Sequence, residues 1–555
     1  MDILIDRKDF AYELSLLANT FLSNAFLSKE ERKDLRIREA EEKDGEARKT
    51  SSLRISLFET GGAESGVCGE TREGDEVRAC VRERFHTPAE AKNAYKRALY
   101  RLLLPLYPET SHPWGILTGI RPVKIVHDLR AKGRSDAEIE NSLRENYLIS
   151  PQKTHLALQI AGRQRGFFER IDRSIGVYIG IPFCPSRCSY CSFFSMDLSK
   201  KESLLLSERY LDALENEMRQ VFRTEVFSAS AVSSIYIGGG TPSALRAEQI
   251  ERLLQMVRSH IPLEEGGEFT FEAGRPDSLD EEKLRRIRDS QVTRISINPQ
   301  TMNDATLGKI GRRHTAQEVK DCFHLARRLG FDNINMDIIL GLEDEGREEL
   351  AHTLKEIVEL GPESLTVHTL SVKRASKLRE ELDEEGKGLS EENISALMDL
   401  TAESAKRMQM QPYYLYRQKN MLQGLENTGY AKRGKESLYN IGMMEERQTI
   451  LAFGSGGISK FVYPQESRIE RVGNIKDVRL YIEKTEELIE RKLQEAGRWS
   501  AYQKERRTVD FERATEDEYG QYQRNETNTV CRKPLDEGGR SAGDTHGMGA
   551  EIEGA

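Results

Sequence analysis

Cysteine is scarce in this chain, with seven residues among 555. Such sparse cysteines exclude a disulfide framework of the kind that stabilises small secreted proteins. No apolar run approaches the roughly 20 residues that a membrane-spanning helix requires. The N-terminal segment MDILIDRKDFAYEL carries acidic residues and lacks the apolar core of a signal peptide. We therefore expect a cytoplasmic protein without a membrane span.

An excess of positive charge is also missing. The chain has 83 Lys and Arg residues against 92 Asp and Glu residues, which gives a net charge of −9. Because no basic stripe stands out, nucleic acid is not expected as the principal partner. The length predicts two to four domains and leaves room for a large enzyme core.

Three of the seven cysteines lie close together, in the segment VYIGIPFCPSRCSYCSFFS. Cys184, Cys188 and Cys191 are spaced as CxxxCxxC. Three thiolates on one tight loop can bind three irons of a [4Fe–4S] cluster and leave the fourth iron open, whereas most iron–sulfur electron carriers use four cysteines. An open iron indicates chemistry at the metal.

Two other interpretations of this triplet are a zinc site and coincidence. A zinc site would need a fourth Cys or His at short spacing, and none follows Cys191 within the loop. The remaining cysteines are scattered, and we interpret them as structural or incidental: Cys68, Cys80, Cys322 and Cys531.

Short β-branched runs alternate with helical patterns from residue 174 onwards, which is typical of parallel βα units. Six strands are predicted at VYIGI, SSIYIGG, FTFEA, TRISI, NINMDIILGL and SLTVHTL, with five helices between them. A full barrel would need eight such units. We therefore predict an α/β fold with a partial (β/α)6 TIM-like barrel, whose site lies at the carboxyl ends of the strands.

The barrel is predicted over residues 171–375. Residues 1–170 are expected to form an α+β domain, with a helix that begins near Pro88 and surface loops around residues 61–76. A mainly helical domain is predicted over residues 376–495. The segment 496–555 is polar, rich in glycine and without periodicity, so we expect it to be disordered.

Glycine-rich and polar segments follow the predicted strands. The run IGGGTPS ends the second strand, and its free backbone groups can bind the ammonium and carboxylate of an amino acid. Glu272, Gln300 and Asp337 lie at or near later strand ends, and Arg312 and His314 follow in GRRHT. Carboxylates suit ribose hydroxyls, and Arg suits a carboxylate. Each residue alone is as often an ordinary turn or core residue, but together they predict a ligand site.

Several of these segments resemble one family. LTGIRPVKI, VYIGIPFCPSRCSYCSF, YIGGGTPS, FTFEA, GRRHT, NMDIILGL and VHTLSVKR are similar to the oxygen-independent coproporphyrinogen III oxidases (dehydrogenases) of the radical S-adenosylmethionine (SAM) superfamily. The segments PYYLYRQKNMLQGLENTGYAKRGKESLYNIGMMEERQTILAFGSGGISK and RIERVGNIKDVRLYIE resemble its HemZ branch. The resemblance covers roughly residues 95–493.

The resemblance implies two cofactors. Cys184, Cys188 and Cys191 would hold a [4Fe–4S] cluster, and SAM would occupy the open iron. The residues that the resemblance places near SAM or the cluster are Tyr178, Tyr190, Gly239, Gly240, Thr241, Glu272, Gln300, Arg312, Asp337, Ser371 and Ile458.

The implied reaction is the oxidative decarboxylation of coproporphyrinogen III propionates to vinyl groups, which gives protoporphyrinogen IX in anaerobic haem biosynthesis. Reductive cleavage of SAM yields a 5′-deoxyadenosyl radical that abstracts hydrogen from the propionate, so no side-chain acid or base is required. We expect a one-electron donor such as flavodoxin or ferredoxin, and a monomeric chain. Candidate cationic partners for the anionic tetrapyrrole are Arg312, Lys373 and Arg374.

Two other functions stay open at this point. The related HemW proteins share the cysteine loop and the GGGTP motif. A resemblance to them implies a chaperone that delivers haem and does not decarboxylate. The same SAM chemistry could also serve another substrate. The chain departs from the family at Gly180, where the best-known branch has a His, and at the usual GLPG turn, which reads GLED over residues 341–344.

Overall fold

A computed structural model describes most of the chain. The described residues are 2–24, 36–39, 54–60, 65–73, 76–108, 112–119, 121–193, 195–371, 393–418 and 424–506. The chain divides into two units, Met1–Gly497 and Arg498–Ala555. Residues 498–506 are helical, so the predicted disorder is wrong for this part, and residues 507–555 lie outside the described residues. None of the described helices is both long enough and apolar enough to cross a membrane.

Six parallel strands form the centre of the larger sheet, in the order β6-β9-β10-β11-β12-β13. This confirms the six predicted βα strands. Their bounds are β6 (Ile175–Ile181), β9 (Val232–Gly239), β10 (Leu263–Phe271), β11 (Arg294–Ser296), β12 (Ile334–Leu340) and β13 (Ser364–Thr369). The strands are rich in β-branched and aromatic residues, which suit a sheet that is covered on both faces.

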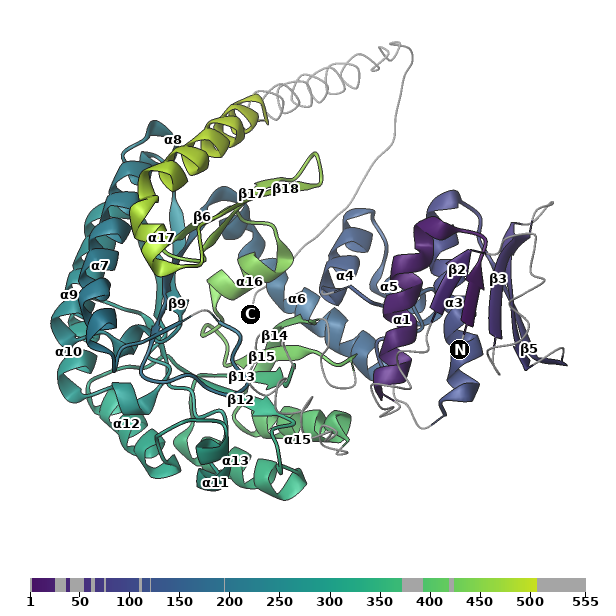
Figure 1. The fold of residues 1–555 in the computed structure, drawn as a ribbon, viewed down its shortest axis with the longest axis horizontal. Helices are drawn as coiled ribbons and strands as arrows, with labels where there is room; N and C mark the ends of the chain where they lie inside the picture. The colour runs from purple at the N-terminus through teal and green to yellow at the C-terminus, as the bar shows by residue number, and fades with distance from the viewer. Residues whose placement is uncertain are drawn as a thin grey trace, which may run out of the picture. The chain divides into compact units, whose positions relative to one another are not determined.

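The five predicted helices lie between these strands and cover the outer face of the sheet (Figure 1). The helices are α7 (Lys201–Phe222), α9 (Ala247–His260), α10 (Glu281–Asp289), α12 (Ala316–Arg328) and α13 (Arg347–Leu360). Helix α9 buries a single face, which carries Ile250, Leu253, Leu254 and Val257.

The barrel is open, as predicted. The first and last of the six parallel strands do not pair with each other: β6 pairs with β16 (Ile450–Phe453), and β13 pairs with β15 (Asn427–Ala431). These additional strands come from the region after the barrel. The sheet is extended on both sides to the order β14-β15-β13-β12-β11-β10-β9-β6-β16-β17-β18.

The C-terminal region contains the expected helices α15 (Ile394–Arg407), α16 (Leu438–Glu445) and α17 (Val478–Glu483). It also contains five strands that the sequence did not lead us to expect, which are β14 (Gln411–Tyr416), β15, β16, β17 (Ile458–Tyr463) and β18 (Arg468–Gly473). The mainly helical C-terminal domain thus also contributes strands to the larger sheet. Its strands form by pairing with the barrel, and such long-range pairing leaves only a weak local signal.

Helix α16 packs against the inner face of the sheet. The ring of Tyr439 lies 4.7 Å from that of Tyr236 and 6.3 Å from that of Tyr178, and both pairs are stacked. The Ser437 hydroxyl at the start of this helix donates to Glu268 on β10 at 2.8 Å. The interior of the open barrel is thus filled by aromatic side chains at its middle.

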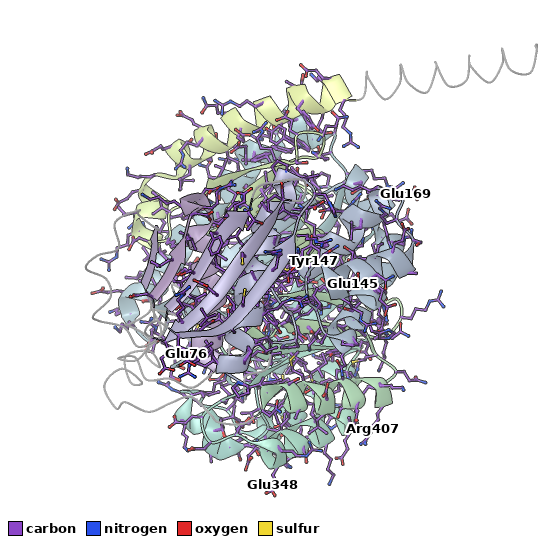
Figure 2. All side chains as sticks on the ribbon, turned by 90° about the vertical axis from the view of Figure 1, so that its right-hand side faces the viewer. Glu76, Glu145, Tyr147, Glu169, Glu348 and Arg407 are labelled. Atoms are coloured by element: carbon purple, nitrogen blue, oxygen red, sulfur yellow. The ribbon has the colours of Figure 1, made fainter. Side chains whose placement is uncertain are left out.

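The N-terminal segment contains both helices and strands, as predicted. A five-stranded sheet in the order β2-β1-β3-β4-β5 packs against α1 (Ala11–Asn24) and α3 (Pro88–Leu103), and Figure 2 shows this sheet facing the viewer. Its strands are β1 (Asp2–Ile5), β2 (Arg36–Glu39), β3 (Arg54–Thr60), β4 (Gly66–Glu73) and β5 (Glu76–Arg84). The expected surface loop around residues 61–76 was therefore wrong over β4, whose glycines pack between neighbours instead of forming a turn.

Candidate active site

The cysteine loop follows β6 and closes on itself at the carboxyl end of that strand. Strand β7 (Phe183–Cys184) pairs with β8 (Met196–Asp197), and the Met196 amide donates to the Pro182 carbonyl at 2.8 Å. Within the loop, the Cys191 amide donates to the Cys188 carbonyl at 3.2 Å. These bonds place the three cysteines on one short loop at the edge where βα folds carry their active sites.

The glycine-rich loop after β9 is bonded directly to the cysteine loop. The Gly240 amide donates to the Ile181 carbonyl at 2.8 Å, and the Thr241 amide donates to the Phe183 carbonyl at 2.7 Å. The Thr241 hydroxyl donates to Cys184 Sγ at 3.4 Å. A Cβ atom at Gly240 would lie only 2.6 Å from the Phe183 carbonyl oxygen. Gly240 is thus required for close backbone contact between the two loops, whereas the sequence suggested contact with a ligand.

This contact predicts that Gly240→Ala disturbs the cysteine loop. The added methyl group meets backbone atoms that cannot rotate away, so we expect the free energy of unfolding of the apo protein to fall by about 1–3 kcal/mol. Gly180→Ala is the matched control, because a Cβ atom there meets its nearest neighbours at 3.4 Å, an ordinary contact. Urea denaturation of both variants tests the prediction, and equal stabilities would contradict it.

Tyr190 and Arg312, two of the predicted site residues, lie together beside the cysteine loop. The Arg312 guanidinium donates to the Tyr190 hydroxyl at 3.2 Å and to the Asn298 carbonyl at 2.8 Å. The Ser189 amide donates to the Ile310 carbonyl at 3.1 Å. Burial is the main cause that raises the pKa of Tyr190, so the phenol is neutral at physiological pH. Because Arg312 is buried and already donates to two groups, it suits a role within the site better than capture of a substrate propionate.

Gln300 and Asp337 are joined through their backbones. The Gln300 amide donates to the Asp337 carbonyl at 2.9 Å, and Gln300 has a φ of 68°, which is uncommon for a residue with a side chain. The Asp337 carboxylate accepts from Asn335 Nδ2 at 2.7 Å and lies 3.8 Å from His368 Nε2. Burial raises the pKa of Asp337, but the bonds from His368 and Asn335 outweigh it and leave the pKa lowered.

Glu272 faces the same interior from the end of β10. It accepts a hydrogen bond from the Tyr236 hydroxyl, and burial raises its pKa to about 7, with the nearby Asp337 charge adding to the effect. Two neighbouring buried carboxyl groups with pKa values that are shifted in opposite directions are typical of functional sites. Glu272 directly follows β10, whereas Asp337 lies within β12, two strands along the sheet.

Several buried polar atoms in this region have no hydrogen-bond partner among the described residues. They include Gln300 Oε1, Asn298 Oδ1 and Arg312 Nε. Since buried polar groups normally find partners, these atoms fit a polar ligand at this place. Together with three free cysteines, they provide the donor set that a [4Fe–4S] cluster and an amino-acid-containing cofactor would need.

No group of three or more His, Cys, Asp or Glu side chains within the described ranges is arranged around a single metal ion. In an iron–sulfur cluster each thiolate bonds a different iron, so its cysteines stand further apart than the ligands of one zinc ion. Burial raises the pKa of Cys184 and of Cys191.

The remaining predicted residues are less closely grouped. Tyr178 lies on β6 and stacks with Tyr236 at a centroid distance of 6.3 Å. Ser371 lies two residues after the end of β13, and Ile458 begins β17 with 47% of its surface exposed. Lys373 and Arg374 lie outside the described residues.

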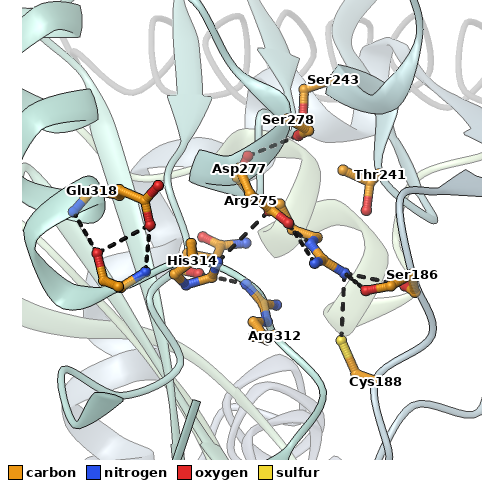
Figure 3. Close-up of polar contacts among 12 residues, drawn as sticks. Ser186, Cys188, Thr241, Ser243, Arg275, Asp277, Ser278, Arg312, His314 and Glu318 are labelled. Carbon is orange, nitrogen blue, oxygen red and sulfur yellow. Dashed lines mark hydrogen bonds and ion pairs between the residues drawn. The ribbon is translucent and has the colours of Figure 1, made fainter. Parts of the chain in front are cut away.

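Sequence reasoning missed two residues of this site, Arg275 and Asp277. Both follow β10 in the run GRPD, and Figure 3 shows Arg275 between Asp277 and the cysteine loop. Arg275 donates to Ser186 and Cys188, and it forms an ion pair with Asp277. An Arg and an Asp two residues apart after a strand were the available signal, but the direction of their side chains is not encoded in that spacing.

Comparison with known proteins agrees with this geometry. Residues 178–357 match the family model described as the radical SAM superfamily. The chain is 39% identical over 437 residues to the oxygen-independent coproporphyrinogen-III oxidase-like protein HemZ of Bacillus subtilis, which covers 77% of this chain and 86% of that protein. It is 31% identical over 300 residues to the heme chaperone HemW of the same organism, covering 54% of this chain and 73% of that protein.

Among solved structures, the coproporphyrinogen III oxidase HemN of Escherichia coli aligns with a TM-score of 0.46 and 22% identity, covering 59% of this chain and 72% of that one. The match to HemZ extends over most of both chains and contains the radical SAM segment. The chain therefore belongs to the radical SAM superfamily and, more narrowly, to the family of oxygen-independent coproporphyrinogen III oxidase-like proteins that includes HemZ.

Proposed function

We propose that this protein removes carboxyl groups oxidatively from the propionates of coproporphyrinogen III, giving the vinyl groups of protoporphyrinogen IX. The observation that carries the proposal is the bonded pair of loops at the end of β6 and β9, in a chain that is 39% identical to HemZ over 86% of its length. This is the part of the fold where a cofactor and a substrate would meet.

The chain's own residues would bind and orient. Cys184, Cys188 and Cys191 would hold the [4Fe–4S] cluster, and Thr241 would steady the Cys184 sulfur through its hydroxyl. The residues proposed to contact SAM are Tyr178, Tyr190, Gly239, Gly240, Thr241, Glu272, Gln300, Arg312, Asp337, Ser371 and Ile458. When bound, the reduced cluster with SAM supplies a one-electron cleavage that generates the radical needed for hydrogen abstraction.

Two features of the interior suit that chemistry. The aromatic side chains of Tyr178, Tyr236 and Tyr439 fill the barrel below the site, which would exclude water from a reactive radical. The phenol of Tyr190 stays neutral beside the cysteines. No side chain is asked to act as an acid or base, because the carboxyl group leaves as CO2 and the remaining electron passes to an external one-electron acceptor.

A second candidate is the transfer of haem without decarboxylation. It is favoured by the match to HemW, a protein named as a heme chaperone, at 31% identity over 73% of its length. A third candidate keeps the SAM chemistry and changes the substrate, and Gly180 favours it, because the best-known branch of the family has a His at this position.

One assay separates these functions. The protein is reconstituted anaerobically with iron and sulfide, then incubated with SAM, dithionite and coproporphyrinogen III. We expect the release of CO2, cleavage of SAM and a product with the mass of protoporphyrinogen IX. Cleavage of SAM without CO2 release would favour another substrate. Tight haem binding with neither product would favour the chaperone.

A further inference from the structure

A buried arginine connects β10 to the cysteine loop from outside the set of predicted ligands. The side chain of Arg275 is only 3% exposed. Its Nη1 atom donates to the Ser186 carbonyl at 3.1 Å and the Ser186 hydroxyl at 3.0 Å, and it lies 3.9 Å from Cys188 Sγ, within hydrogen-bond range for sulfur. The arginine therefore contacts both the backbone of the loop and the sulfur of a predicted ligand (Figure 3).

Asp277 fixes the orientation of that guanidinium. Its two carboxylate oxygens accept from Arg275 Nε at 3.0 Å and from Nη2 at 2.7 Å, a two-point contact that holds the plane of the group. His314 lies on the other side of the carboxylate, with Nδ1 at 3.7 Å from Asp277 Oδ1. With one edge of the guanidinium bound to Asp277, Nη1 faces the cysteine loop.

The backbone that carries Arg275 is held as well. The Ser278 hydroxyl donates to the Arg275 carbonyl at 2.7 Å, and the Ser243 hydroxyl donates to the Ala273 carbonyl at 2.8 Å. Ser243 belongs to the glycine-rich loop after β9, which is itself bonded to the cysteine loop. A charged side chain that is buried in so rigid a setting is costly unless its charge is used or matched.

We propose that Arg275 is a positioning residue that holds the Cys188 sulfur and raises the reduction potential of the cluster. This inference rests on the proposed function, since it assumes a cluster on Cys184, Cys188 and Cys191. Reduction adds one negative charge, supplied by an external one-electron donor. A buried cation and an N–H···S contact at a ligand sulfur both favour the more negative state, and hydrogen bonds to sulfur and local charge are known determinants of cluster potential.

The two parts of this role can be separated by substitution. Arg275→Gln keeps a donor group but removes the charge, whereas Arg275→Lys keeps the charge and loses the two-point contact with Asp277. A role limited to holding the loop would change how much cluster is retained without changing its potential. Arg285→Gln is the matched control, because Arg285 is an exposed arginine on α10 that donates to Glu281 one turn earlier in the helix.

The test is a redox titration of the reconstituted proteins without substrate, with dithionite and mediators, monitored by electron paramagnetic resonance. Iron and sulfide content are measured in parallel. At the potential where the wild-type cluster is half reduced, we expect Arg275→Gln to show a reduced-to-oxidised ratio about tenfold lower, which corresponds to a shift of about 59 mV. Arg275→Lys should fall between this variant and the wild type, and Arg285→Gln should match the wild type.

Wild-type potentials in both Arg275 variants would overturn the inference, even if their cluster content fell. If Arg275→Gln retains no cluster, the Arg275→Lys potential decides. Lys keeps the charge but loses the two-point contact with Asp277, so an unchanged potential would contradict the role of a positioned N–H···S contact. Failure of the wild type to decarboxylate coproporphyrinogen would count against the proposed substrate alone, since the potential is measured without it. A wild type that assembles no iron–sulfur cluster would overturn both.

Discussion

Cys188→Ser should lose most of its iron after anaerobic reconstitution. A serine hydroxyl stays protonated and is a poor ligand for iron beside sulfide, whereas a thiolate is the ligand that such clusters select. Loss of partners that only support a ligand already costs 10–100-fold in metal affinity. Removal of a ligand itself is therefore expected to lower SAM cleavage by more than about 100-fold. Iron and sulfide analysis, with the formation of methionine from SAM, measures both effects.

Two other cysteines provide controls for this prediction. Cys322 is buried in α12 and Cys80 is exposed on β5, so serine at either position removes a thiol without touching the loop. Both variants should bind iron and cleave SAM as the wild type does. Binding of one zinc per chain by the wild type, with no cluster formed under anaerobic reconstitution, would contradict the prediction and favour the zinc interpretation of the triplet.

The barrel was predictable because each of its strands has a clear local sequence pattern. Runs such as VYIGI and NMDIIL are apolar, β-branched and separated by amphipathic helices, so hydrophobic pattern and propensity agree. Strand β18 (RIERVG) has no buried residue, and β16 (ILAF) has only four residues. Their existence depends on pairing with β17 and β6. Short strands that form by such long-range pairing carry too little local pattern to be recognised.

The sequence indicated which segments meet at the site, but it did not indicate which contacts their residues make. Strand ends meet at one edge in a βα fold, and Tyr190 and Arg312 lie together there. Gly240 has a structural reason that the sequence did not suggest, since a Cβ atom there would meet the Phe183 carbonyl oxygen. Arg275 was missed because a contact between its side chain and Cys188 depends on how the loop after β10 turns, which no spacing rule gives.

A buried ion pair ties the C-terminal helix, which follows α17 and begins at residue 485, to the barrel. Glu217 on α7 and Lys492 are both 0% exposed, and Lys492 Nζ donates to Glu217 Oε1 at 2.5 Å. The same carboxylate accepts from Asn474 Nδ2 at 2.8 Å, the Tyr481 hydroxyl at 2.7 Å and the Gly454 amide at 2.9 Å. Glu217 thus joins the C-terminal residues to the glycine-rich loop before β17.

This network reaches the cysteine loop through a second residue of α7. The Tyr210 hydroxyl donates to the Gly180 carbonyl at 2.5 Å and accepts from the Ser455 amide at 3.1 Å. Gly180 lies four residues before Cys184. The loop around Ser455 is therefore held from two points on α7, Glu217 and Tyr210.

We expect Lys492→Met to lower the free energy of unfolding by about 3–5 kcal/mol. The substitution keeps most of the side-chain volume but leaves Glu217 buried and charged without its cation, which is the costly way to break a buried pair. Urea denaturation of the apo protein measures the loss. In Glu217→Gln/Lys492→Met both charges are removed, so the double variant should be more stable than the Lys492→Met single variant.

Lys484→Met is the matched surface control. Lys484 pairs with Glu487 at 3.5 Å, and the two side chains are 50% and 57% exposed. An exposed pair of this kind contributes less than about 1 kcal/mol. If Lys492→Met cost no more than this control, the Glu217 carboxylate would have to be satisfied by Asn474, Tyr481 and Gly454 alone. The C-terminal helix would then hold the loop beside Gly180 through packing and not through charge.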